Sequence, residues 1–110
     1  MIELPDDEIL SLSMEHNFWT WSAQGKVNPI PLKSAKGVYF WDVHDKRYLD
    51  LNSMTMCVNI GHGDERVIQA IIDQAQELPY AAPGMATRAR AMLGKKLSGI
   101  LPAGLTRYLY

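Results

Sequence analysis

Residues 37–51 read GVYFWDVHDKRYLDL and contain two short runs that are rich in aromatic and branched residues. The runs Gly37–Asp42 and Arg47–Leu51 are typical of β-strands, and Val43–Lys46 between them suits a hairpin connection. Two strands alone are only marginally stable in water, so this hairpin needs a third strand or a helix to pack on. The sequence therefore predicts an antiparallel hairpin inside a mixed structure of helices and strands.

Two amphipathic helices are predicted after the hairpin. The first opens at Asp64 and ends before Pro79, and its apolar residues recur with the period of one helical face. The second has Thr87 as its cap and ends before Pro102. The region that follows the hairpin is therefore expected to be mainly helical.

The two ends of the chain have different patterns. Pro5 is followed by three acidic residues, which suits the start of a short helix that ends near His16. The stretch Asn17–Leu32 contains one glycine and two prolines, so extended and irregular backbone is expected there. Thr106–Tyr110 reads as a strand, and a chain that stops inside a strand is unusual for a complete domain.

Composition and charge exclude several classes of protein. The chain has 110 residues, 47% of them hydrophobic, and a formal net charge of -1, which fits one globular domain without a basic face for nucleic acid. No apolar run approaches the ~20 residues of a membrane span, and the acidic N-terminus does not resemble a secretory signal. The single cysteine excludes an internal disulfide. We therefore expect a cytoplasmic protein with no nucleic-acid or membrane partner.

The chain is rich in residues that usually fill a core: it has three tryptophans, five tyrosines and six methionines. Core packing is the first expectation for each of them. Cys57 has no nearby partner that would generate a thiolate, so it is expected to be a small buried hydrophobe. Phe18, Trp19 and Trp21 cluster in a segment of weak periodicity, which leaves a surface role open for these three.

The segment Ser53–Asp64 reads SMTMCVNIGHGD and joins the hairpin to the first long helix. Its Gly61–Gly63 tripeptide could present backbone N–H groups to an anion, but it lacks the known glycine-rich phosphate-binding patterns. Asp64 also places a carboxylate where a bound phosphate would lie. A structural turn is therefore the favoured interpretation.

The remaining polar residues give no catalytic constellation. The three histidines form no pair at metal-ligand spacing, so no metal site is expected. Asp42, Asp45 and Asp50 are expected to serve turns and strand ends. Arg88 and Arg90 are expected to be solvent-exposed, with a substrate or partner carboxylate as the alternative. No nucleophile–base pair or acid pair can be assembled, so no catalytic residue is assigned.

The order of these features resembles the N-terminal part of the class III pyridoxal-phosphate aminotransferases, the group of ω-amino-acid and 4-aminobutyrate transaminases. The resemblance covers residues 16–110 and points to the family rather than to one substrate. The positions that carry it are Gly37–Asp42, Asp45, Tyr48–Asp50, Ser53, Asn59–Gly63, Val67–Ile71, Gln74, Leu78, Thr87, Leu93, Leu97 and Pro102.

The resemblance implies the α/β fold of a fold-type I pyridoxal-phosphate enzyme, of which this segment by itself would be α+β. Residues 1–78 would form the N-terminal part of the small domain, with the antiparallel hairpin and a helix. Residues 79–110 would form a linker, a helix and the first strand of the large cofactor domain. Family enzymes are dimers with active sites at the subunit interface, so a homodimer, or a companion chain that carries the rest of the enzyme, is expected.

The resemblance also assigns residues to the substrate side of the active site. They are Phe18 and Trp19 at the entrance, Met54, Met56 and Cys57 in the pocket loop, and Gly84 and Met85 in a segment that reaches the neighbouring subunit's site. The implied substrates are an amine or amino-acid donor and a keto-acid acceptor.

The implied cofactor is pyridoxal 5'-phosphate, whose main binding residues are expected outside this chain. The family uses a small-residue turn for the phosphate, an aspartate at the pyridine nitrogen and a catalytic lysine. The lysines of the hairpin, loops and helix surfaces do not match that lysine, so the segment alone is expected to be inactive. Lys46 stands where the family hairpin has a glycine after Asp45, and a left-handed backbone there would cost roughly 1 kcal/mol.

Two alternative functions stay open. One is a noncatalytic interaction module, a small α+β protein that binds a partner through its aromatic segment and hairpin. The other keeps the same family but replaces amino transfer with the chemistry of a racemase or aminomutase.

Overall fold

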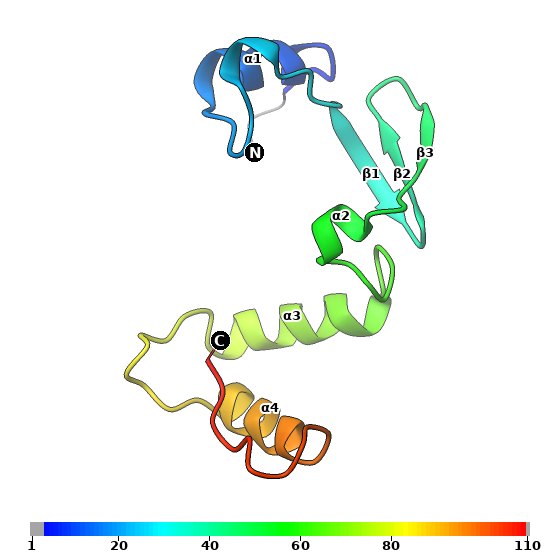
Figure 1. Cartoon of the computed structure of the whole chain (residues 1–110). Coiled ribbons are helices and arrows are strands. Elements are labelled where there is room, and N and C mark those ends of the chain that lie inside the picture. Colours follow the sequence, from blue (N-terminus) through cyan, green and yellow to red (C-terminus); the bar gives the residue numbers. More distant parts are fainter. Residues whose placement is uncertain (1–3, 110) are drawn as a thin grey trace. The chain divides into compact units, whose positions relative to one another are not determined.

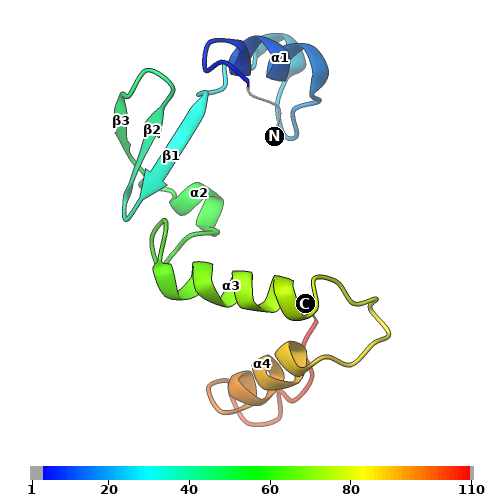
Figure 2. The same cartoon turned by 180° about the vertical axis from the view of Figure 1, so that it is seen from behind.

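The computed structural model describes residues 4–109, and its helices and strands are labelled in Figure 1 and seen from behind in Figure 2. The chain forms two compact units, one that ends at Gln69 and one that begins at Ala70. The elements are α1 (Glu8–His16), a short 3-10 turn (Gln24–Lys26), β1 (Leu32–Lys36), β2 (Tyr39–Asp42), β3 (Arg47–Leu49), α2 (Ser53–Met56), α3 (Glu65–Glu77) and α4 (Arg88–Ser98). The segment is therefore α+β, as predicted, while the domain boundary after residue 78 stays a prediction.

Strands β1, β2 and β3 form one antiparallel sheet in chain order (Figure 1). The pair β2–β3 is the predicted hairpin, with Trp41 opposite Arg47. Strand β1 is the third strand that this hairpin needs, and the sequence analysis missed it because LKSAK lacks β-branched and aromatic residues. A two-residue turn joins β1 to β2, and Gly37 has a φ of +60° in this turn, so β2 begins two residues later than predicted.

The turn between β2 and β3 is organised by the carboxylate of Asp42, which is 5% exposed. Its Oδ1 accepts the backbone N–H groups of His44 (2.9 Å) and Lys46 (3.0 Å), and its Oδ2 accepts the hydroxyl of Tyr48 (2.8 Å). Burial raises the pKa of Asp42. These hydrogen bonds lower it by more than burial raises it, so the pKa lies below its ordinary value. The positive φ of the turn, +59°, falls on Asp45, so the strain predicted for Lys46 does not arise.

The predicted core of aromatic and methionine side chains does not form within residues 4–109, where no hydrophobic side chain is buried. Phe18 is 84% exposed and Trp21 is 96% exposed. On the sheet, Phe40 stacks on Tyr48 with ring centroids 4.9 Å apart. A small sheet and short helices offer few facing apolar layers, so polar contacts fix much of the local structure.

Helices α1, α3 and α4 agree with the sequence prediction to within a few residues, whereas α2 was not predicted. Helix α1 ends at His16 as expected but begins at Glu8, and α3 begins directly after Asp64. The hydroxyl of Thr87 caps α4 by accepting the backbone N–H of Arg90 at 3.3 Å, which confirms the predicted cap. No helix in the described part of the chain is long and apolar enough to cross a membrane.

The strand predicted at Thr106–Tyr110 is not formed over residues 106–109, and Tyr110 lies outside the described residues. A strand needs the N–H and C=O groups of a neighbouring strand, and no strand among residues 4–109 pairs with this segment. The hydroxyl of Tyr108 instead donates to the carbonyl of Leu105 at 2.6 Å. The strand-like composition of this segment is therefore not enough for a strand to form in residues 106–109.

A backbone bridge joins the β1–β2 turn to the loop between α2 and α3. The N–H of Gly37 donates to the carbonyl of His62 at 2.9 Å, and the N–H of His62 donates to the carbonyl of Gly37 at 2.8 Å. Gly61 precedes this bridge with a φ of +95°, and a β-carbon there would lie 3.2 Å from the carbonyl oxygen of Gly37. Both observations favour glycine at this position, and the segment forms the predicted structural turn.

We expect Gly61→Ala to lower the free energy of unfolding by about 1–2 kcal/mol, because alanine is strained at this positive φ and crowds Gly37. The measurement is urea unfolding of the protein. Gly25→Ala is the matched control, since Gly25 lies in a 3-10 turn, has no positive φ, and has no atom within 4 Å of the position that a β-carbon would take. Equal effects of the two substitutions would contradict the prediction.

Candidate functional site

The segment after β3 turns with the opposite hand to an ordinary helix. The four residues of α2 have φ values of +49°, +44°, +61° and +64°. The turn is closed by the N–H of Met56, which donates to the carbonyl of Asn52, and by the N–H of Cys57, which donates to the carbonyl of Ser53, both at 2.9 Å. Left-handed backbone costs about 1–2 kcal/mol for each non-glycine residue. Such strain persists only where the surroundings hold it in place.

An Asp50–His62 pair lies beside this turn and supplies that support. Nε2 of His62 is 2.7 Å from Oδ2 of Asp50, and the two side chains are 11% and 6% exposed. The carboxylate also accepts the backbone N–H groups of Asn52 at 3.2 Å and Met54 at 3.1 Å. The hydrogen bond from His62 lowers the pKa of Asp50, burial opposes it, and the backbone N–H groups lower it further. An ionised carboxylate only accepts hydrogen bonds, so Nε2 of His62 carries a proton.

Sequence reading assigned these two residues separately and missed their pairing. Asp50 was expected to serve a strand end and His62 a glycine-flanked turn, and each does so. The available signal was an aspartate directly after a strand, which commonly accepts N–H groups two residues on. Nothing in the spacing of twelve residues indicates that the histidine ring returns to this carboxylate.

The three residues predicted for the pocket loop lie on or directly after α2. Met54 is half-buried and Met56 is 70% exposed. Cys57 is exposed, with Sγ 3.5 Å from the carbonyl of Thr55, so the prediction of a buried hydrophobe was wrong. The reason is that this turn lies outside any apolar core. It therefore presents sulfur-containing side chains that a ligand can contact.

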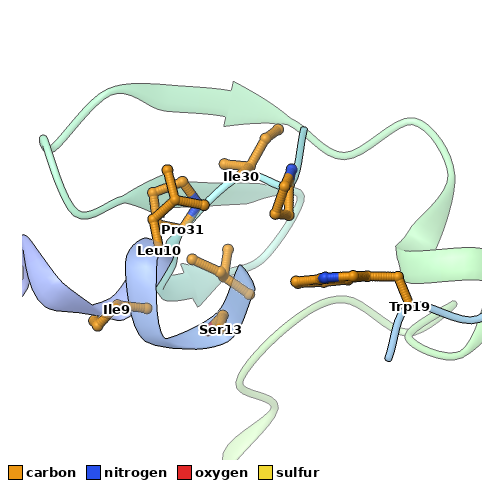
Figure 3. A pocket seen from close by; sticks show the side chains of 8 residues that line it. Ile9, Leu10, Ser13, Trp19, Ile30 and Pro31 are labelled. Atoms are coloured by element: carbon orange, nitrogen blue, oxygen red, sulfur yellow. The ribbon is translucent and has the colours of Figure 1, made fainter. Parts of the chain in front are cut away.

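Trp19 lines a cavity of about 130 Å³ that is formed by α1 and the segment Pro29–Leu32 (Figure 3). Its backbone is held by Gln24, whose side-chain amide accepts the backbone N–H of Trp19 at 2.9 Å and donates to the backbone carbonyl of Trp19 at 2.6 Å. Phe18 does not line this cavity and is largely exposed to solvent. None of the pocket-loop residues lines it either, so the structure does not bring the two predicted groups into one pocket.

Gly84 and Met85 lie in the second unit, in the loop before α4, and both are exposed. Nη1 of Arg90 lies 3.3 Å from the carbonyl oxygens of Pro83 and Met85. Arg90 is exposed, as predicted, but its contact with this loop was not anticipated. The guanidinium therefore ties the loop to the first turn of α4.

The start of α3 is occupied by the carboxylate of Asp64. Arg66 donates to it through its backbone N–H at 3.0 Å, through Nε at 3.0 Å and through Nη2 at 2.6 Å. The side-chain hydrogen bond from Arg66 outweighs burial and lowers the pKa of Asp64 to about 2. The helix start therefore already holds an anion, as the sequence indicated.

The lysines of the chain are all exposed. Nζ of Lys33 lies 3.1 Å from Asp45 and 3.7 Å from Asp6, and the hydrogen bond that Lys33 donates to Asp45 raises the pKa of Lys33. Nζ of Lys46 lies 4.8 Å from the centre of the Tyr48 ring. A lysine nucleophile needs a lowered pKa or an apolar pocket, and Lys33 has the opposite environment.

Residues 21–109 match the family model for class III aminotransferases. The chain is 31% identical over 99 residues to the acetylornithine aminotransferase of Methanothermobacter thermautotrophicus, covering 90% of this chain and 24% of that protein. It is 33% identical over 89 residues to the isoleucine 2-epimerase of Lentilactobacillus buchneri, covering 80% of this chain and 20% of that protein.

A solved structure has the same arrangement of elements. The taurine:2-oxoglutarate aminotransferase of Bifidobacterium kashiwanohense matches with a TM-score of 0.82 and 37% identity, covering 91% of this chain and 22% of that one. That structure is a complex with pyridoxal phosphate and glutamate. The chain therefore spans only about a quarter or less of the length of these relatives.

The Asp64–Arg66 contact should make the start of α3 sensitive to acid. The pKa of Asp64 falls from 3.8 to about 2 on folding, so the native carboxylate holds its proton less tightly than the unfolded one. Its contribution to stability is complete above about pH 3.8 and is lost as the pH falls through about 2. We expect the urea midpoint of Asp64→Asn to change less than that of the wild type over this window. Parallel curves for the two proteins would contradict this assignment.

Proposed function

Because this chain belongs to the class III aminotransferase family, we propose that it forms part of a pyridoxal-phosphate-dependent enzyme that moves an amino group from an amine or amino acid to a keto acid. The observation that carries the proposal is the likeness to the taurine:2-oxoglutarate aminotransferase over nearly all of this chain. The turn α2 supports the proposal because its exposed sulfur-containing side chains offer an apolar surface that a substrate can contact.

The residues of this segment do not fit a complete pyridoxal-phosphate site. The start of α3 is filled by the carboxylate of Asp64, so it does not suit a phosphate. Asp42 and Asp50 are both engaged by donors from their own turns, and the lysines are exposed. We therefore propose that the catalytic lysine and the main cofactor contacts come from outside these 110 residues, and that the segment is inactive alone. When bound, pyridoxal phosphate supplies the electron sink for the reaction.

The task proposed for this segment is to shape the substrate pocket. Met54 and Met56 would exclude water from the reacting group and contact the apolar part of the donor. Thioether side chains adapt to ligands of different shape, which suits donors that vary in chain length. Gly84 and Met85, held by Arg90, would contribute to the pocket of a neighbouring subunit in a homodimer. The expected cytoplasmic location stays a prediction.

The family hosts more than one reaction, and an isoleucine 2-epimerase is among the relatives. We propose transfer over epimerisation because the acetylornithine and taurine enzymes are both named as aminotransferases. A noncatalytic interaction module is disfavoured by the extent of the family match.

The full-length protein that contains this segment should transfer amino groups. We expect it, when saturated with pyridoxal phosphate, to form glutamate from 2-oxoglutarate or alanine from pyruvate with taurine, L-ornithine or putrescine as donor. Product formation by chromatography is the measurement. Inversion of L-isoleucine without any keto-acid consumption would instead indicate an epimerase.

Met56→Ala should change the choice of donor rather than the stability of the protein. Removing a thioether from the pocket wall should alter the ratio of kcat/KM for taurine to that for L-ornithine by about tenfold. Met92→Ala is the matched control, because Met92 is also an exposed methionine but lies on α4. If both substitutions shift the ratio equally, or neither does, Met56 does not line the pocket.

A further inference from the structure

We propose that Asp50, oriented by His62, is a positioning residue that holds the left-handed turn α2 and so sets where Met54 and Met56 point in the substrate pocket. The inference rests on the proposed function for the identity of that pocket. It assigns a role to Asp50 and His62, which are not among the residues predicted to contact the substrate.

The geometry of the pair supports this role. The carboxylate of Asp50 accepts N–H groups from the backbone that leads into the turn, at Asn52, and from the turn itself, at Met54. Nε2 of His62 donates to the same carboxylate at 2.7 Å. Both side chains are nearly inaccessible to solvent, so water does not compete easily for these contacts.

The position of His62 is set by the sheet. Its backbone forms two hydrogen bonds with Gly37 in the β1–β2 turn, at 2.8 and 2.9 Å. The N–H of Asp50 donates to the carbonyl of Val38 in that turn at 2.9 Å. The β1–β2 turn therefore fixes the backbone of both Asp50 and His62. The two side chains that hold α2 are in this way attached to the sheet.

The hand of α2 decides the direction of its side chains. Right-handed backbone is the preferred state of Ser53–Met56, since none of these residues is glycine. Release of the N–H groups at Asn52 and Met54 would let the turn relax toward that state, which projects the methionines in other directions. The pocket wall therefore depends on a carboxylate that need not touch the substrate.

Asp42 provides an internal comparison within the same sheet. It accepts the N–H groups of residues two and four positions on, as Asp50 does, together with one side-chain donor. The turn that it organises has a single residue of positive φ, Asp45, and carries no residue assigned to the pocket. Loss of Asp42 should therefore lower the stability of the protein without changing how it binds the substrate.

The test compares Asp50→Ala with Asp42→Ala in the full-length protein, matched for cofactor content by visible absorbance. The donors are taurine, L-ornithine and putrescine, with 2-oxoglutarate or pyruvate as acceptor. We expect Asp50→Ala to raise the KM for the donor about tenfold and to change kcat by less than about twofold, because binding rather than chemistry is weakened. Asp42→Ala should leave KM within about twofold of the wild type. An unchanged KM in Asp50→Ala, or equal increases in both variants, would overturn the proposal.

A second pair of variants tests the histidine and remains informative if Asp50→Ala does not fold. His62→Leu removes the donor to the carboxylate, whereas the amide of His62→Gln can still donate an N–H. We expect the KM to rise in His62→Leu and to return toward the wild-type value in His62→Gln. Equal KM values in the two variants would count against a positioning role.

Hydrogen exchange separates this inference from the proposed function. The amides of residues 52–58 should exchange faster in Asp50→Ala than in Asp42→Ala, whatever reaction the enzyme catalyses. If the wild type transfers no amino group from any of the three donors, the proposed function fails and this exchange difference alone judges the turn. If the wild type is active but exchange and KM are unchanged in Asp50→Ala, the positioning role fails while the function stands.

Discussion

The hydrogen bond between His62 and Asp50 is the contact on which the local structure of the candidate site depends. It joins residues twelve positions apart and lies between the β1–β2 turn and the left-handed turn α2. In a protein with a large core, packing would hold such a strained turn, but residues 4–109 bury no hydrophobic side chain. A nearly buried carboxylate that accepts three N–H groups takes over that task, because hydrogen bonds to an ionised group are about twice as strong as neutral ones.

The same device appears twice along the sheet. Asp42 and Asp50 each follow or end a strand, each accept N–H groups from the next turn, and each receive one side-chain donor. Hydrogen bonding lowers the pKa of both, which keeps them ionised at neutral pH. The first organises an ordinary hairpin turn, and the second organises a turn that bears residues proposed to meet the substrate. The difference between them lies in what each turn carries.

The exposed apolar residues fit a segment that works as part of a larger enzyme. Helix α3 has isoleucines along one face, and they are exposed within this chain. The relatives are about four times as long as this chain, and they are named as two aminotransferases and an epimerase. This agrees with the proposal above that the segment forms one wall of a pocket whose chemistry is supplied by groups outside it.

The sequence by itself determined the hairpin, the two amphipathic helices, the Thr87 cap and the glycine turn at Gly61, because these depend on local patterns of polarity, side-chain shape and backbone freedom. It also predicted the family, through the order of short motifs. Only the tertiary structure revealed β1, whose residues have little strand preference and form a strand because β2 offers hydrogen-bond partners. The structure alone also decided the pairing of Asp50 with His62, the hand of α2 that this pair supports, and the exposure of Cys57. The first two depend on a contact between residues twelve positions apart, and the third follows because residues 4–109 bury no hydrophobic side chain.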